Sequence, residues 1–169
     1  MQTMNRSWPL LAGLMFAACV PAQRAGTAPT DSVFAQVQQR GQVVMGVDQY
    51  ASAHIFEDLP DGGRVVLEHG SATDTAAIAT IRRHMREIAT DFRAGNFAKP
   101  FAVHAQAVPG TDVMTARRDM IRYEVVDRPR GAEVKIIATD SLAVTAVHQF
   151  LAFQRMDHRA AGHEAHGKP

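Results

Sequence analysis

A short hairpin followed by a long amphipathic helix is predicted twice in this chain, and that repeat limits the fold more than any other feature of the sequence. Two extended runs around a turn rich in Asp and Gly are typical of a β-hairpin. The first unit consists of strands at His54–Leu59 and Arg64–His69, a turn at Pro60–Gly63, and a helix from Asp74 or Thr75 to about Phe92. The second consists of strands at Met120–Val126 and Ala132–Ala138, a turn at Asp127–Gly131, and a helix capped by Asp140.

The helices of the two units carry matching apolar stripes. Apolar positions that recur at steps of three and four bury one face of a helix. In the first helix they are Ile78, Ile81, Met85, Ile88 and Phe92, and in the second Val144, Val147, Leu151 and Phe150 or Gln154. We therefore expect an α+β fold in which two strand–strand–helix units form an antiparallel sheet with two long helices packed on one face. A short helix from Asp31 to Arg40, stopped by Gly41, and a helical turn at Thr111–Arg118 complete the expected elements.

The N-terminal residues are typical of an export signal. Arg6 precedes the apolar run Trp8–Ala18, which is shorter than the roughly 20 apolar residues of a membrane-spanning helix. In one interpretation, Phe16–Cys19 is a lipobox and Cys19 carries a lipid; in another, cleavage follows Ala22. A third is a buried core helix. We favour an exported, periplasmic lipoprotein anchored in the membrane, because the only cysteine of the chain falls at the position that lipidation requires.

The sequence divides into a signal peptide at 1–18, a flexible tether at 19–30, a single α+β domain at 31–159 and a His-containing flexible tail at 160–169. Removing residues 1–18 takes away Arg6 and no acidic residue, so 17 Lys and Arg then balance 17 Asp and Glu. Because a nucleic-acid-binding protein needs a basic face, we expect no nucleic-acid partner. With Cys19 lipidated or removed, no disulfide can form inside the domain.

Several catalytic signatures are missing from the sequence. There is no Gly-x-Ser-x-Gly elbow and no thiol nucleophile in the domain. There is no glycine-rich loop for a nucleotide, no Cys-x-x-Cys-His for covalent haem, and no helical His-Glu-x-x-His zinc motif. His163-Glu-Ala-His166 does not replace that motif, because its histidines are three residues apart in a Gly-flanked tail. The sequence therefore favours a protein that is not an enzyme.

Histidine is the residue type most suggestive of a functional site, since the chain contains eight histidines. Neutral imidazole binds zinc and copper, and thioether sulfur adds a preference for Cu(I). His84 lies at the margin of the first helix's apolar stripe, His148 lies on the core side of the second helix, and His104 lies in a loop or short strand at Phe101–Pro109. His148 and His158 are separated by about 15 Å if one helix carries both. In that case, His148 and His158 cannot both bind the same ion.

Two further patterns have alternative readings. His158, His163 and His166 either form a metal-scavenging tail or belong to a solvated terminus. An aspartate beside a histidine can hold it as a general base, which would suit a small hydrolase or lyase. The candidate aspartates are Asp91, Asp112, Asp119 and Asp157.

A series of motifs spread over Ala53–Arg159 carries a family resemblance. They are His84-Met-Arg-Glu-Ile-Ala89, Phe92-Arg-Ala-Gly-Asn-Phe97, His104, Val108-Pro-Gly110, Met114, Ala146–Gln154 and Asp157-His158. Together they resemble an uncharacterised family of small exported bacterial proteins, some of which are labelled aspartate carbamoyltransferase. That enzyme needs a chain nearly twice as long, with Ser-Thr-Arg-Thr and His-Pro-x-Gln segments, so its activity is not carried over. The resemblance implies a site formed by His84, His104, Met114, His148 and His158, rather than by His54, His69, His163 or His166.

The sequence thus favours a periplasmic, lipid-anchored domain that binds a transition metal, copper before zinc, for storage, delivery or resistance. The metal ligands are expected among His84, His104, His148 and His158, with Met114 as a soft ligand. The first alternative is an envelope module that binds a protein or small ligand and whose histidines are structural. The second is the hydrolase or lyase with a His–Asp base.

Overall fold

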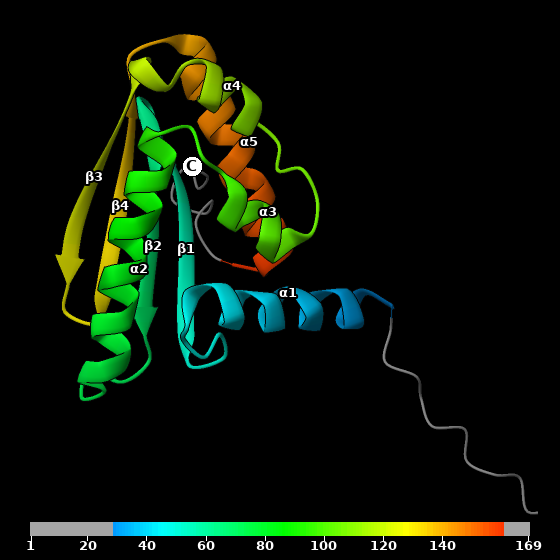
Figure 1. The fold of residues 1–169 in the computed structure, drawn as a ribbon, viewed down its shortest axis with the longest axis vertical. Coiled ribbons are helices and arrows are strands. Elements are labelled where there is room, and N and C mark those ends of the chain that lie inside the picture. The colour runs from blue at the N-terminus through cyan, green and yellow to red at the C-terminus, as the bar shows by residue number, and fades with distance from the viewer. Residues whose placement is uncertain (1–28, 161–169) are drawn as a thin grey trace, which may run out of the picture.

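The computed structural model describes residues 29–160, which form a four-stranded antiparallel sheet with the long helices on one face (Figure 1). The strand order is β1-β2-β4-β3, so the two hairpins join through their second strands. The strands are β1 (Ser52–Leu59), β2 (Gly62–His69), β3 (Ile121–Arg128) and β4 (Gly131–Ala138). The helices are α1 (Pro29–Met45), α2 (Thr75–Arg93), α3 (Ala98–His104), α4 (Thr111–Ala116) and α5 (Ser141–His158), with a 3-10 turn η1 at Arg118–Met120. The predicted α+β fold of two strand–strand–helix units is confirmed.

Both hairpins close more tightly than the sequence predicts. Leu59 pairs with Gly62, and Arg128 pairs with Gly131, so each turn has two unpaired residues. The φ angle of Gly62 is +140°, and a Cβ there would lie 2.1 Å from the carbonyl oxygen of Ile136. Glycine is therefore required where β2 begins beside β4.

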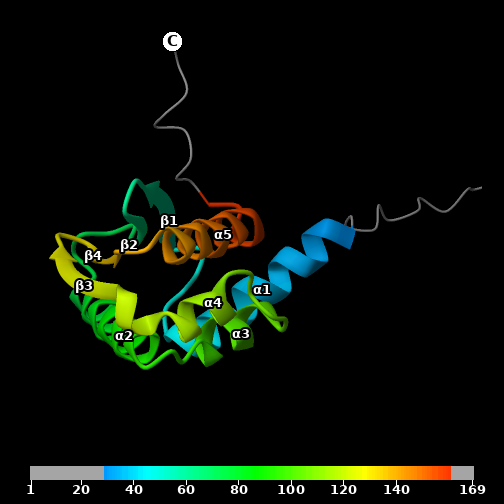
Figure 2. The same ribbon diagram turned by 90° about the horizontal axis from the view of Figure 1, so that it is seen from above.

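The helices α2 and α5 begin at the predicted caps. The side chain of Asp74 accepts a hydrogen bond from the backbone N–H of Ala77 at 2.9 Å, and that of Asp140 accepts one from Leu142 at 3.1 Å. Each helix packs mainly on the hairpin of the other unit, since α2 contacts β3 and β4 most and α5 contacts β1 and β2 most, with fewer contacts to β2 and β4, respectively. Figure 2 shows both helices on the same side of the curved sheet. Because each helix packs across the boundary between the units, the two units share one core.

The core lies between this sheet face and the helices. Its fully buried side chains include Leu67, Ile81, Tyr123, Val134, Ile136 and Leu151. Burying side chains of this size stabilises the fold by about 1.5–3 kcal/mol each. The rings of Phe92, Phe97 and Phe150 close one end of the core, with centroids 4.5 to 6.1 Å apart. The opposite sheet face carries ion pairs, among them Arg128 with Glu133 at 2.8 Å.

Two expectations about local structure are wrong. The first helix starts at Pro29, inside the predicted tether, and continues past Gly41 to Met45, where Gly46 ends it with a φ of +72°. The segment around His104 is not a loop or strand, because α3 spans Ala98–His104. Its Pro100 is tolerated because the first turn of a helix does not use those backbone N–H groups.

None of the helices in the range 29–160 is long and apolar enough to cross a membrane. The predicted signal peptide, Cys19, most of the tether, and the tail histidines His163 and His166 lie outside the described residues.

Candidate functional site

A small cavity lies between α2 and α5, on the sheet face formed by β1 and β2. Residues of α1 and α3 complete its walls. Its volume is about 70 Å³, several times the roughly 10–15 Å³ that one water molecule needs. Pockets for drug-sized organic ligands have about 300–1,000 Å³. The space therefore suits an ion with a few ligands or a very small molecule.

Four histidines from four different elements line this cavity, which we call the histidine pocket. They are His54 on β1, His84 on α2, His104 at the end of α3 and His158 at the end of α5. The ring of His158 lies 4.8 Å from that of His54 and 5.0 Å from that of His104, measured between centroids. Phe56 stacks on His54 at 5.5 Å. The fold thus gathers side chains that are up to 104 residues apart, between His54 and His158.

Three of these histidines are neutral at physiological pH. Burial, together with His84 and His104, lowers the pKa of His54 to about 4. Burial, followed by the charge of Lys99, lowers the pKa of His84 to about 4. Burial and the neighbouring imidazoles lower the pKa of His158 to about 3. A neutral imidazole keeps one nitrogen lone pair, which is the form that binds a metal ion.

The fourth histidine is held in place by two side chains of α5. The Nδ1 atom of His104 pairs with a carboxylate oxygen of Asp157, and its Nε2 lies 2.9 Å from Oε1 of Gln154. A histidine that binds a metal through one nitrogen usually donates the other N–H to such a carboxylate. In His104, Gln154 occupies the position that a metal ion would take.

Two buried polar atoms of the pocket make no hydrogen bond within the described part of the chain. They are Nδ1 of His158 and Nε2 of Gln154. Leaving such an atom unsatisfied costs about 1–3 kcal/mol. Native proteins rarely keep such groups without a partner, so both atoms are suited to bond with a ligand or a water molecule in the pocket.

The structure does not bring all the predicted ligands together. His84, His104 and His158 line the pocket, whereas His148 does not, because its Nε2 faces the backbone oxygen of Leu59 at 2.9 Å. Since α5 continues from His148 near its middle to His158 at its C-terminal end, these two side chains are separated along the helix axis. Met114 is fully buried in the core and is not among the residues that line the pocket.

Of the four candidate aspartates, Asp157 is the one that pairs with a histidine. Asp91 pairs with Lys99, whereas Asp119 is exposed and lies 4.0 Å from Arg118. Asp112 borders a separate groove between α3 and α4.

Sequence reasoning missed several residues of the pocket. His54 shares a strand face with Phe56 and Asp58, and the register of β1 on β2 turns that face toward the helices. The alternation of residue types along His54–Leu59 does not show which face of the strand is buried, since both faces carry an acidic residue. Met45, Met85 and Lys99 also line the pocket.

The histidine pocket is not a preformed metal centre. Within residues 29–160, no three His, Cys, Asp or Glu side chains are arranged to hold one ion. Metal binding would thus require side-chain rotation. Rotation of the His158 ring breaks no hydrogen bond at Nδ1, because this atom has no partner among these residues.

No protein-family model, curated protein or solved structure matches this chain.

Proposed function

We propose that this is an exported, lipid-anchored protein of the periplasm that binds a transition-metal ion, copper before zinc, in the histidine pocket. Storage, delivery or resistance would be its role. The observation that carries the proposal is the gathering of His54, His84, His104 and His158 around one small cavity.

The protonation state of the pocket supports this proposal. His54, His84 and His158 have pKa values of about 4, 4 and 3, so a metal ion does not have to displace protons from them at neutral pH. In the tautomer that carries its proton on Nε2, the partnerless Nδ1 of His158 supplies a lone pair to the ion.

The pairing of His104 with Asp157 at the pocket wall also supports the proposed metal site. Asp157 fixes the ring through Nδ1, so that Nε2 faces Gln154. If the amide of Gln154 turns away and Nε2 gives up its proton to solvent, this nitrogen becomes a fourth ligand whose orientation is already set. Thioether groups of Met45 and Met85 also line the cavity, and soft sulfur favours copper over zinc.

The test is a metal titration of the purified protein, with His163→Ala and His166→Ala introduced to remove the tail histidines. Binding of about one equivalent is expected, and an ion at 100 times its Kd should stabilise the fold by about 2.7 kcal/mol. The single substitutions His84→Asn and His158→Asn should each weaken binding. His69→Asn, on the surface outside the pocket, is the matched control.

Circular dichroism spectra confirm that each variant is folded. The proposal fails if copper and zinc leave the unfolding temperature of the protein unchanged. It also fails if His69→Asn reduces the affinity as much as the pocket variants do.

A second function is favoured by one observation, the pairing of Asp157 with His104 at the pocket wall. An aspartate that orients a histidine is the arrangement of a general base. The residues that line the pocket include no Ser, Thr or Cys nucleophile, so a small substrate would have to be activated by proton removal. Turnover of a small ester or amide that Asp157→Asn abolishes, with no metal bound, would favour this function.

A further inference from the structure

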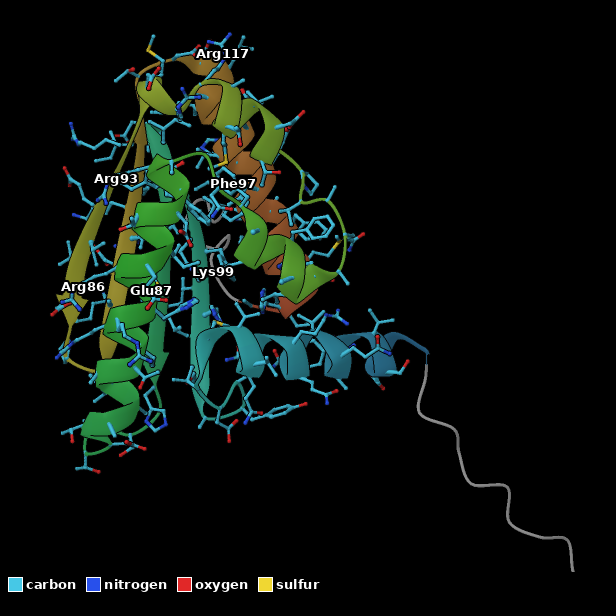
Figure 3. The ribbon with its side chains drawn as sticks, viewed as in Figure 1. Arg86, Glu87, Arg93, Phe97, Lys99 and Arg117 are labelled. Atoms are coloured by element: carbon cyan, nitrogen blue, oxygen red, sulfur yellow. The ribbon has the colours of Figure 1, made fainter. Side chains whose placement is uncertain are left out.

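The charged side chains next to the histidine pocket already have partners before an ion enters it. Lys99 extends from α3 toward α2, where it pairs with Asp91 (Figure 3). The carboxylate of Asp157 pairs with His104. Apart from the histidines, Lys99 is the one residue lining the cavity with an ionisable side chain. No carboxylate among the lining residues is therefore free to offset the charge of an ion.

Two soft, uncharged donors lie in the same cavity. Met85 follows His84 on α2 and is 2 % exposed, and Met45 comes from the end of α1 and is 7 % exposed. A thioether binds Cu(I) far better than a hard divalent ion. His84 and Met85 are both buried residues of α2 and both line the cavity, so each reaches it from this helix.

We propose, on the basis of the proposed function, that the pocket is selective for a soft monovalent cation, Cu(I), and discriminates against Zn²⁺. The neutral imidazoles of His54, His84 and His158 bind the ion, and the Met85 thioether sets the preference for a soft metal.

Charge is the physical reason for this selectivity. The cost of burying an ion rises with the square of its charge, so a divalent ion needs anionic ligands or a bound hydroxide more than a monovalent one does. Zinc sites with three protein ligands keep a water in the fourth position. The side chains of Phe92, Ile88 and Val103 make much of the cavity wall apolar, so such a water would find few hydrogen-bond partners there.

The first experiment compares affinities by competition with chelators of known strength. Cu(I) is supplied without oxygen, and Ag(I) serves as a monovalent soft ion that does not change oxidation state. Both should bind at least about 100-fold more tightly than Zn²⁺. Equal affinities for Ag(I) and Zn²⁺ would overturn the inference.

The second experiment removes the thioether while keeping the side-chain volume. Met85→Leu should weaken Ag(I) binding about tenfold or more and change Zn²⁺ binding less than about twofold. Met114→Leu makes the same change in the core away from the pocket lining, and should alter neither affinity. An unchanged Ag(I) affinity in Met85→Leu contradicts the role of this thioether.

The third experiment removes the cation that pairs with the Asp91 carboxylate. Lys99→Gln leaves Asp91 without its cation beside the pocket, so Zn²⁺ affinity should rise about fivefold or more, and Ag(I) affinity should rise less. Lys135→Gln removes the same charge from the opposite sheet face and is the control. If Zn²⁺ gains no more than Ag(I) in Lys99→Gln, charge does not set the selectivity.

These outcomes separate the inference from the proposed function. A protein that binds none of these ions refutes both. A protein that binds Zn²⁺ as tightly as Ag(I), with both affinities reduced by His84→Asn, keeps the metal site and refutes the monovalent selectivity.

Discussion

Lowering the pH from about 7 to about 5 should strongly destabilise the protein, because three histidines of the pocket, His84 buried and His54 and His158 half-buried, are neutral in the folded state. An unfolded histidine has a pKa of 6.5, whereas His54, His84 and His158 have folded-state values of about 4, 4 and 3. As the pH falls below 6.5, the unfolded chain binds protons that the folded chain does not, and unfolding becomes more favourable. The stability is thus complete above that pH and is lost as the pH falls toward the folded-state pKa values.

The size of the effect follows from these values. Between about pH 7 and pH 5, each histidine withdraws about 1.8 kcal/mol from the free energy of unfolding, or about 5 kcal/mol for the three together. This is comparable with the total stability of many small domains, which is about 5–15 kcal/mol. A partly unfolded protein near pH 5 is therefore expected without any change in the core.

Urea unfolding of the metal-free protein, followed by far-ultraviolet circular dichroism at both pH values, measures this loss. In His84→Leu the loss should be smaller by about 1.8 kcal/mol, because one of the three titrating groups is gone. His69→Asn, which changes a histidine outside the pocket, should behave like the unaltered protein. Equal stability at the two pH values, or an unchanged loss in His84→Leu, would refute the reasoning.

Three further predictions concern separate parts of the molecule. Gly62→Ala should lower the free energy of unfolding by more than about 2 kcal/mol in urea titrations, because its Cβ would collide with the backbone of β4. Gly70→Ala is the control: its Cβ would lie 3.2 Å from the nearest atom, so it should lower the free energy of unfolding less. Asp157→Asn should leave the folded spectrum intact and weaken copper binding about 10–100-fold, measured by competition with a chelator. Cys19→Ala should move the protein from the membrane fraction to the soluble fraction of its host, and unchanged membrane association would contradict lipidation.

The fold could be predicted because its signals are local. Asp74 and Asp140 cap their helices through their own side chains, and the apolar stripes that follow are long enough to define one buried face each. Packing of each helix on the other unit's hairpin is not encoded locally. It follows from the strand order β1-β2-β4-β3, which depends on contacts across the whole domain.

The pocket could be predicted only in part. His84, His104 and His158 were among the expected ligands, but His54 requires knowledge of which face of β1 is buried. The helix α3 spans seven residues and includes Pro100, so periodicity does not reveal it. Lys99 and His104 reach the pocket through that short helix. The separation of His148 from His158, in contrast, follows directly from helical rise once α5 is continuous.

In the proposed function, an ion binds to the imidazoles of the pocket. Nitrogen-15 NMR of the histidine side chains during a titration with Ag(I) tests it most directly, since it reports each ring separately. The resonances of His54, His84 and His158 are expected to shift together and to stop shifting at about one equivalent, while that of His69 stays in place. Shifts confined to His69, His163 and His166, or shifts that never reach a plateau, would contradict it.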